Sequence, residues 1–167
     1  MSRRGFTILE TLLVLALFII IASIAVPSID AMYSGVKITA AADTVRGHWA
    51  DARARAVEDG IAYRFSVVPQ SGKFKIGPDD DSQADGGGDA PMKVEDTLPG
   101  NVNFADASQA SSDASDGEYQ AVVVFLPDGT AREDVQVGFR TRGTRTLVLK
   151  LRGLTGAVTS HWEGGGQ

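Results

Sequence analysis

The pattern of apolar and polar residues divides the 167-residue chain into three parts. Residues 11–29 contain no charged side chain, and as a helix this run would extend roughly 30 Å, enough to cross a bilayer. Between residues 30 and 59 apolar residues recur every three or four positions, which predicts an amphipathic continuation of the helix that ends at Gly60. Charged residues such as Arg53 lie mostly off this apolar face. The members of the face are Ile38, Ala41, Val45, Trp49, Ala52 and Ala56.

After Gly60 the apolar period falls to two, which is typical of half-buried strands. Residues 119–126 are apolar except for Gln120 and are predicted to form a central strand, followed by a tight turn at Pro127–Thr130. The sequence therefore predicts an α+β fold, in which the long helix packs on one antiparallel β-sheet in the C-terminal domain, residues 60–163. The other predicted strands are 61–67, 73–76, 98–104, 135–139, 147–151 and 154–162.

Two stretches rich in small and acidic residues interrupt the strand pattern. Residues 77–91 and 105–117 are interpreted as loops of the β-domain, because strand-like residues 98–104 lie between them. Residues 164–167 form a Gly-rich tail that we expect to be disordered.

Composition excludes several kinds of chemistry. The formal net charge of −5 argues against a general polyanion binder, so nucleic acid is not an expected partner. The chain has no cysteine and only two histidines, His48 and His161, each beside a tryptophan and interpreted as a surface or packing residue. No Gly-x-Ser-x-Gly turn is present, and residues 86–88 lack the Lys-Ser/Thr that follows a phosphate-binding glycine loop. We therefore expect a protein that is not an enzyme and has no cofactor.

The first acidic loop offers oxygen atoms of the kind that calcium prefers. An EF-hand comparison that starts at Asp81 places Met92 where a bidentate glutamate is required. A solvated acidic loop is therefore favoured, and no metal site is predicted. The carboxylates considered were those of Asp79, Asp80, Asp81, Asp85 and Asp89.

The N-terminal apolar run has features that neither a cleaved secretory signal nor a plain anchor explains. The run is longer than a signal core, and no Ala-x-Ala site ends it. Arg3 and Arg4 precede it, which predicts a cytoplasmic N-terminus with the rest of the chain outside. Glu10 costs about 3 kcal/mol in an apolar helix and so needs a cationic partner. Cleavage between Gly5 and Phe6 would create one, a new α-amino group four residues before Glu10.

Residues 4–10, Arg-Gly-Phe-Thr-Ile-Leu-Glu, resemble the class III signal of type IV pilins and type II secretion pseudopilins. The resemblance implies that residues 1–5 are a leader peptide. It implies cleavage after Gly5 and N-methylation of Phe6 by a prepilin peptidase, for which this protein is a substrate. Glu10 is then the glutamate used for subunit registration.

The same resemblance implies how the chain is placed in the cell. Residues 6–29 are the hydrophobic transmembrane and filament helix, with a kink at Pro27, and residues 30–59 continue it. The protein is then a single-pass inner-membrane protein with a periplasmic C-terminal domain. After assembly it lies in a periplasmic pseudopilus.

Later segments resemble the H-type minor pseudopilins, the GspH/FimT group. They are residues 52–66, where the helix leads into the first strand, and residues 122–131 and 147–160. The resemblance implies a structural minor pseudopilin that assembles with other major and minor pseudopilins and supports protein secretion across the outer membrane. Secreted cargo and the secretin are further candidate partners. The alternative is a minor type IV pilin that acts in pilus assembly, DNA uptake or adhesion.

A set of basic residues gathers on two adjacent predicted strands and their turn. The simpler interpretation is a row of solvent-facing positions that oppose edge-to-edge aggregation. The alternative is a contact surface for an acidic partner, either a protein such as a neighbouring subunit or, with less support, DNA. The set consists of Arg140, Arg142, Arg145, Lys150 and Arg152.

Overall fold

The computed structural model describes residues 7–79, 92–108, 115–116, 119–141 and 144–163, with the backbone alone at 24–32, 106–108 and 115–116. The predicted leader at residues 1–5, the tail at 164–167 and most of both acidic loops lie outside the described residues.

Helix α1 (Ile8–Asp59) unites the apolar run and the amphipathic segment in one continuous helix. Thr7 is its N-cap, and the Thr7 hydroxyl accepts a hydrogen bond from the backbone N–H of Glu10 at 3.2 Å. Because Thr7 has extended backbone, the first helical residue is Ile8. Gly60 ends α1 in the left-handed conformation with φ +68°, which glycine adopts without steric cost.

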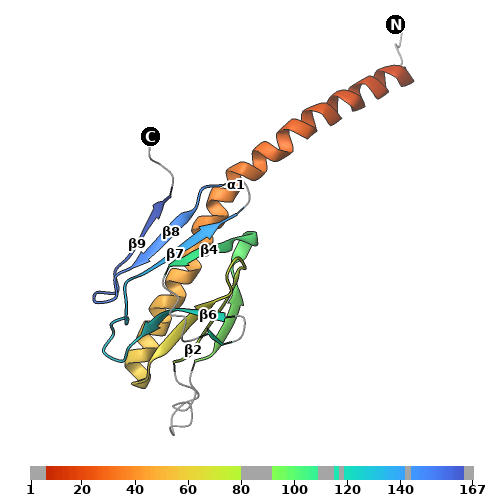
Figure 1. The fold of residues 1–167 in the computed structure, drawn as a ribbon. Helices are drawn as coiled ribbons and strands as arrows, with labels where there is room; N and C mark the ends of the chain where they lie inside the picture. The colour runs from red at the N-terminus through yellow and green to blue at the C-terminus, as the bar shows by residue number, and fades with distance from the viewer. Residues whose placement is uncertain (1–6, 80–91, 109–114, 117–118, 142–143, 164–167) are drawn as a thin grey trace.

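The helical assignment of α1 continues through Pro27. Figure 1 shows the helix changing direction between its projecting N-terminal part and the part that lies against the sheets. A bend in this region fits the kink expected at proline, whose ring removes one backbone hydrogen bond of the helix.

The rest of the chain forms two antiparallel sheets that lie against the same helix (Figure 1). One sheet has the order β3-β2-β1-β6-β5 and the other the order β4-β7-β8-β9. The elements are β1 (Tyr63–Val67), β2 (Lys73–Pro78), β3 (Val94–Thr97), the 3-10 turn η2 (Pro99–Asn101), β4 (Asn103–Ser108), β5 (Ser115–Asp116), β6 (Tyr119–Phe125), β7 (Val135–Arg140), β8 (Leu147–Leu151) and β9 (Val158–Trp162).

The hydrophobic core lies between the C-terminal half of α1 and both sheets. All six residues of the predicted apolar face are buried, with at most 2% of each exposed. Trp49 packs edge-on against Phe65 of β1 at a ring distance of 5.8 Å, and Phe65 stacks on Phe74 of β2 at 5.5 Å. The helical period of the sequence therefore identified the packed face correctly.

The structure corrects the predicted strands in two places. The β-domain has two sheets instead of one. β6 is an inner strand, as predicted, and lies between β1 and the two-residue β5. The apolar run of β6 corresponds to the burial of Ala121–Phe125. After the turn, the chain returns and Ala131 forms a bridge with Phe125. The predicted strand at 98–104 is broken by η2, where Gly100 has φ +73°.

The structure also corrects the bounds of the predicted loops. The predicted loop at 105–117 is partly strand, since β4 extends to Ser108 and β5 pairs with β6. The predicted loop at 77–91 likewise begins inside β2, which ends at Pro78. The short polar strand β3 was not predicted, because its four residues show no apolar alternation.

Candidate assembly interface

The N-terminal half of α1 is an apolar rod that no other described part of the chain covers. Every large apolar side chain from Ile8 to Ile21 is between 41% and 82% exposed. Figure 1 shows this part of the helix projecting beyond the two sheets. Exposed apolar surface of this extent is typical of a protein–protein or membrane contact.

The exposed apolar side chains surround the helix instead of forming one stripe. Ile19, Ile20 and Ile21 are consecutive, so their side chains point about 100° apart around the axis. All three are more than half exposed, at 67%, 58% and 54%. A helix that is apolar all round requires apolar cover on all sides, from lipid or from several neighbouring helices.

Glu10 is the single charged residue of this rod, in the first turn of α1. Its backbone N–H is held by the Thr7 cap, and its side chain is exposed. A carboxylate in the first turn interacts favourably with the positive end of the helix dipole. The exposed side chain is also accessible to a cation from a neighbouring molecule.

Within the part of the chain that the structure describes, no helix combines the length and the apolar character needed to cross a membrane.

The C-terminal half of α1 is fixed to the turn regions of both sheets by Arg53. The Arg53 Nε–H donates to the carbonyl oxygen of Gly129 at 2.5 Å. The Arg53 guanidinium also lies against Gly156, whose φ of +69° and lack of a Cβ make room for it. Arg53 is therefore half-buried beside the apolar face, whereas the charged residues as a group were expected to lie mostly off it.

The turn after β6 is held by a second set of local bonds. Asp128 accepts hydrogen bonds from the hydroxyl and the backbone N–H of Thr130, at 2.7 and 2.9 Å. These two bonds hold the pKa of the Asp128 carboxyl below its usual range. The tight turn predicted at Pro127–Thr130 is confirmed, since Leu126 N donates to the Thr130 oxygen at 2.8 Å.

The basic residues on β7, β8 and their connection are only partly brought together. Arg140, Arg145 and Arg152 are exposed, and Lys150 is half-buried. Arg142 lies outside the described residues. Register pairs Gln136 with Lys150, so Arg140 is four residues further along β7 than the position opposite Lys150. The set is spread along one sheet and does not form a compact cluster.

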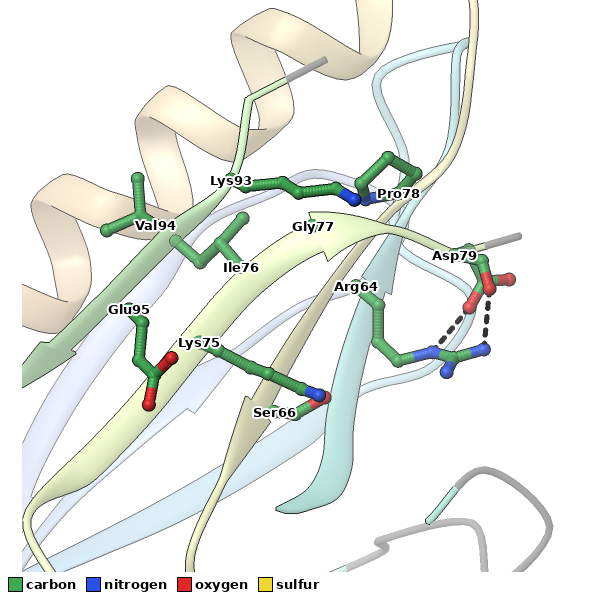
Figure 2. Close-up of a pocket in the computed structure, with 10 residues that line it drawn as sticks. All are labelled: Arg64, Ser66, Lys75, Ile76, Gly77, Pro78, Asp79, Lys93, Val94 and Glu95. Carbon is green, nitrogen blue, oxygen red and sulfur yellow. Dashed lines mark hydrogen bonds and ion pairs between the residues drawn. The ribbon is translucent and has the colours of Figure 1, made fainter. Parts of the chain in front are cut away.

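A hollow of about 360 Å³ lies over the β3-β2-β1 part of the first sheet (Figure 2). At one side of it, Arg64 Nε donates to Asp79 Oδ1 at 2.7 Å, and Arg132 Nη2 reaches Asp79 Oδ2 at 3.0 Å. At the other side, Lys75 Nζ lies 4.6 Å from the ring centroid of Tyr119. The charged groups at this hollow thus interact with neighbouring residues of the same sheet region.

Asp79 therefore differs from the solvated carboxylate expected at the start of the acidic loop. Only 15% of its side chain is exposed, and two arginines neutralise it. Asp80, Asp81, Asp85 and Asp89 lie outside the described residues. Among the residues that are described, no group of three or more His, Asp or Glu side chains is placed to hold a metal ion.

The two histidines occupy unrelated places. His48 is half-buried on α1, and its ring packs against Phe74 with a centroid distance of 5.1 Å. His161 is exposed on β9. The structure thus confirms a packing role for His48 and a surface position for His161.

No protein-family model and no curated protein matches the sequence. The structure, however, is similar to the solved structure of the minor pseudopilin EpsH from the type 2 secretion system of Vibrio cholerae. The TM-score is 0.54 at 9% sequence identity, and the match covers 77% of this chain and 98% of EpsH. The chain has the minor pseudopilin fold. The resemblance seen in the sequence and the likeness of the two structures therefore agree.

The predicted site residues differ in whether they lie within the described residues. Gly5 and Phe6 lie outside the described residues, so cleavage and methylation stay predictions. Glu10 lies on the exposed apolar rod, and its role in assembly stays a prediction. Asp79 was considered only as a calcium ligand, and Arg64 and Arg132 were not singled out, because their pairing with Asp79 joins β1, the end of β2 and the segment after β6. Arg53 had one sequence signal, its position four residues after Trp49 on the same helical face.

Proposed function

We propose that this protein is a structural minor pseudopilin of a type II secretion system, assembling with other pseudopilins to support protein secretion across the outer membrane. The observation that carries the proposal is the exposed apolar half of α1 on a domain with the minor pseudopilin fold. The domain buries its own core without these residues, so their apolar surface serves contacts with other molecules. The activity is assembly, with no reaction of its own.

The membrane is the first environment of the apolar rod in this proposal. Residues 6–29 hold the protein in the inner membrane before assembly, with Arg3 and Arg4 on the cytoplasmic side. The β-domain then lies in the periplasm. After assembly, the helices of neighbouring pseudopilins replace lipid around the rod, which accounts for apolar side chains on all sides.

Glu10 acts at the step between membrane and filament. Its carboxylate pairs with the α-amino group of a processed neighbour and thereby sets the register of the two helices. The pairing depends on cleavage between Gly5 and Phe6 by the prepilin peptidase, which produces that amino group. Secreted cargo and the secretin remain further candidate partners of the β-domain.

Mass spectrometry of the mature N-terminus tests the proposal directly. In membranes of a cell that contains the peptidase, we expect the chain to begin at N-methylated Phe6. A peptidase-deficient strain is the control and should retain the leader. Gly5→Leu should block cleavage, because the residue before the cut must be small, while Gly35→Leu on the exposed side of α1 should be processed normally. An intact Met1 or Ser2 terminus in peptidase-positive membranes would contradict the proposal.

A further inference from the structure

The two sheets have four edges, and they differ in how well they resist pairing with another chain. An exposed regular edge strand offers unpaired N–H and C=O groups to a further strand, and proteins normally blunt such edges. β3 carries Glu95 and Asp96 and is only four residues long. β5 has two residues, and β4 has a register shift between Phe104 and Ala107. These three edges are blunted by charge, shortness or irregularity.

The fourth edge, β9, has none of these features. It pairs with β8 in unbroken register over five residues, from Leu147 opposite Trp162 to Leu151 opposite Val158. Its sequence, Val-Thr-Ser-His-Trp, contains no lysine, carboxylate or proline. No other described strand pairs with its outer side. β9 is therefore a regular, uncharged strand with an open edge.

The hydrogen bonds around β9 identify which backbone groups are open. Glu163 N donates to the Thr146 oxygen at 2.8 Å, and Arg152 N donates to the Ala157 oxygen at 2.9 Å. In an antiparallel ladder the bonded residues alternate, so Thr159 and His161 direct their backbone groups toward β8. The N–H and C=O groups of the residues between them point away from β8. These residues are Val158, Ser160 and Trp162.

The side chains of the same three residues lie on the sheet face that contacts α1, because their partners are Leu147, Leu149 and Leu151 of the core. Trp162 is 42% exposed there. Val158 borders a groove of about 870 Å³ between α1 and the sheet, together with Val57, which is 54% exposed. A strand added to β9 would place alternate side chains beside Trp162 and Val158, at the mouth of this groove.

We propose that β9 accepts an extended segment of a different pseudopilin, which adds a fifth strand to the β4-β7-β8-β9 sheet. The segment carries apolar residues at alternate positions, facing Trp162 and Val158. Main-chain hydrogen bonds to Val158, Ser160 and Trp162 provide affinity, and the groove selects the side chains. This inference rests on the proposed function, since it assigns the partner to the assembly.

A second copy of this chain does not fit the open edge in such an assembly. Two β9 strands would pair antiparallel about a two-fold axis perpendicular to the sheet. That axis reverses every direction in the plane of the sheet, including that of α1, which lies along its face (Figure 1). The two apolar rods would then project to opposite ends and could not enter one membrane or one helical bundle. The partner is therefore a different chain.

The test uses the full chain expressed with the peptidase and with the other pseudopilins of its own cell, one of which carries a purification tag. Ser160→Pro removes an outward N–H and places a ring at the open edge, while the bonds to β8 remain. Ser160→Thr keeps the N–H and is the matched control. We expect wild type and Ser160→Thr to co-purify equally and Ser160→Pro to fall about tenfold, at equal processed levels in the membrane.

Amide hydrogen exchange of the wild-type complex gives an independent measurement that does not depend on how the proline variant folds. We expect exchange at Val158, Ser160 and Trp162 to slow about tenfold or more in the complex, and exchange at Thr159 and His161 to change little. Unchanged exchange at the three outward amides would overturn the inference, as would full co-purification of Ser160→Pro. If wild type co-purifies with no pseudopilin, the proposed function fails and the inference with it.

Discussion

The two halves of α1 have the same secondary structure but opposite surroundings. From Ile38 to Ala56 the helix buries one apolar face against two sheets of its own chain, and its other sides are polar. From Ile8 to Ile21 it is apolar on all sides and lies against nothing in the described chain. The pattern of apolar residues, and not helix formation, therefore decides what each half is for.

A helix with one apolar stripe can satisfy its hydrophobic surface within one domain, because a single sheet face covers that stripe. A helix that is apolar on all sides cannot bury its surface in this way, since one sheet would leave most of that surface exposed. The N-terminal half of α1 therefore requires apolar contacts on all sides, from lipid or from a bundle of similar helices. The four predictions below test this difference, starting with the largest expected effect.

Trp49→Ala should destabilise the β-domain by about 3–5 kcal/mol, because it removes the largest side chain between α1 and the sheets. Leu13→Ala is the matched control on the other half, where the side chain is 62% exposed, and should change stability by less than about 0.5 kcal/mol. Denaturant unfolding of both full-length variants in mild detergent measures the effect. Equal destabilisation by the two changes would show that the halves fold as one unit.

Glu10→Gln should leave insertion and cleavage intact, since neutral glutamine is easier to bury and the Gly5–Phe6 bond is unchanged. Assembly should suffer, because loss of a buried charge pair amounts to roughly 3 kcal/mol. That corresponds to about a hundredfold in each association step. Cross-linking to the neighbouring pseudopilin below it, at equal processed levels, measures the loss. Undiminished cross-linking would show that Glu10 is not an assembly residue.

Tyr63→Phe tests the last turn of the packed half. Tyr63 Oη donates to Asp59 Oδ2 at 2.5 Å and accepts from Met92 N at 3.1 Å, so its loss should cost about 1 kcal/mol at neutral pH. Burial raises the pKa of the Tyr63 phenol, and the bond to Asp59 adds to the effect.

The sign of this shift sets the pH dependence of Tyr63. The folded state favours the neutral phenol, so its contribution is fully present below the ordinary pKa of 10.0 and is lost as pH rises through the higher folded pKa. Wild type should therefore lose stability more steeply than Tyr63→Phe in alkaline denaturation series. Parallel curves for the two proteins would exclude this contribution.

Removal of residues 1–29 should have the smallest effect on the domain. The first buried core residue of α1 is Ile38, so the truncation removes no side chain of the described core. We expect a soluble protein with a cooperative melt and an unfolding free energy within about 1 kcal/mol of the full chain. An insoluble product, or a broad melt by circular dichroism, would show that the apolar half supports the β-domain.

Sequence periodicity predicted those parts of the fold that depend on one element at a time. The buried face of α1, the end of the helix at Gly60 and the alternation in β1, β2, β7 and β8 follow from local spacing. The exposed apolar rod was also predictable from the sequence, because nineteen consecutive residues without a charged side chain do not form a polar helix surface.

What the sequence did not predict depends on which segments become neighbours. Alternation shows that a strand has a buried face, but it does not say which strand lies beside it, so the division into two sheets was missed. The pairing of Asp79 with Arg64 and Arg132 joins residues 15 and 53 positions apart. The open edge of β9 is likewise a property of strand order and not of its own five residues.

Thr7 separates the start of the helix from the bond at which maturation would take place. The hydrogen bonds of the first turn run from Glu10 and Thr11 back to Thr7. In the proposed maturation, hydrolysis between Gly5 and Phe6 would remove none of these hydrogen bonds. Maturation then alters the charge at the end of the rod without altering the rod itself. In the proposed function, the same helix therefore lies in lipid before the cut and in the filament after it.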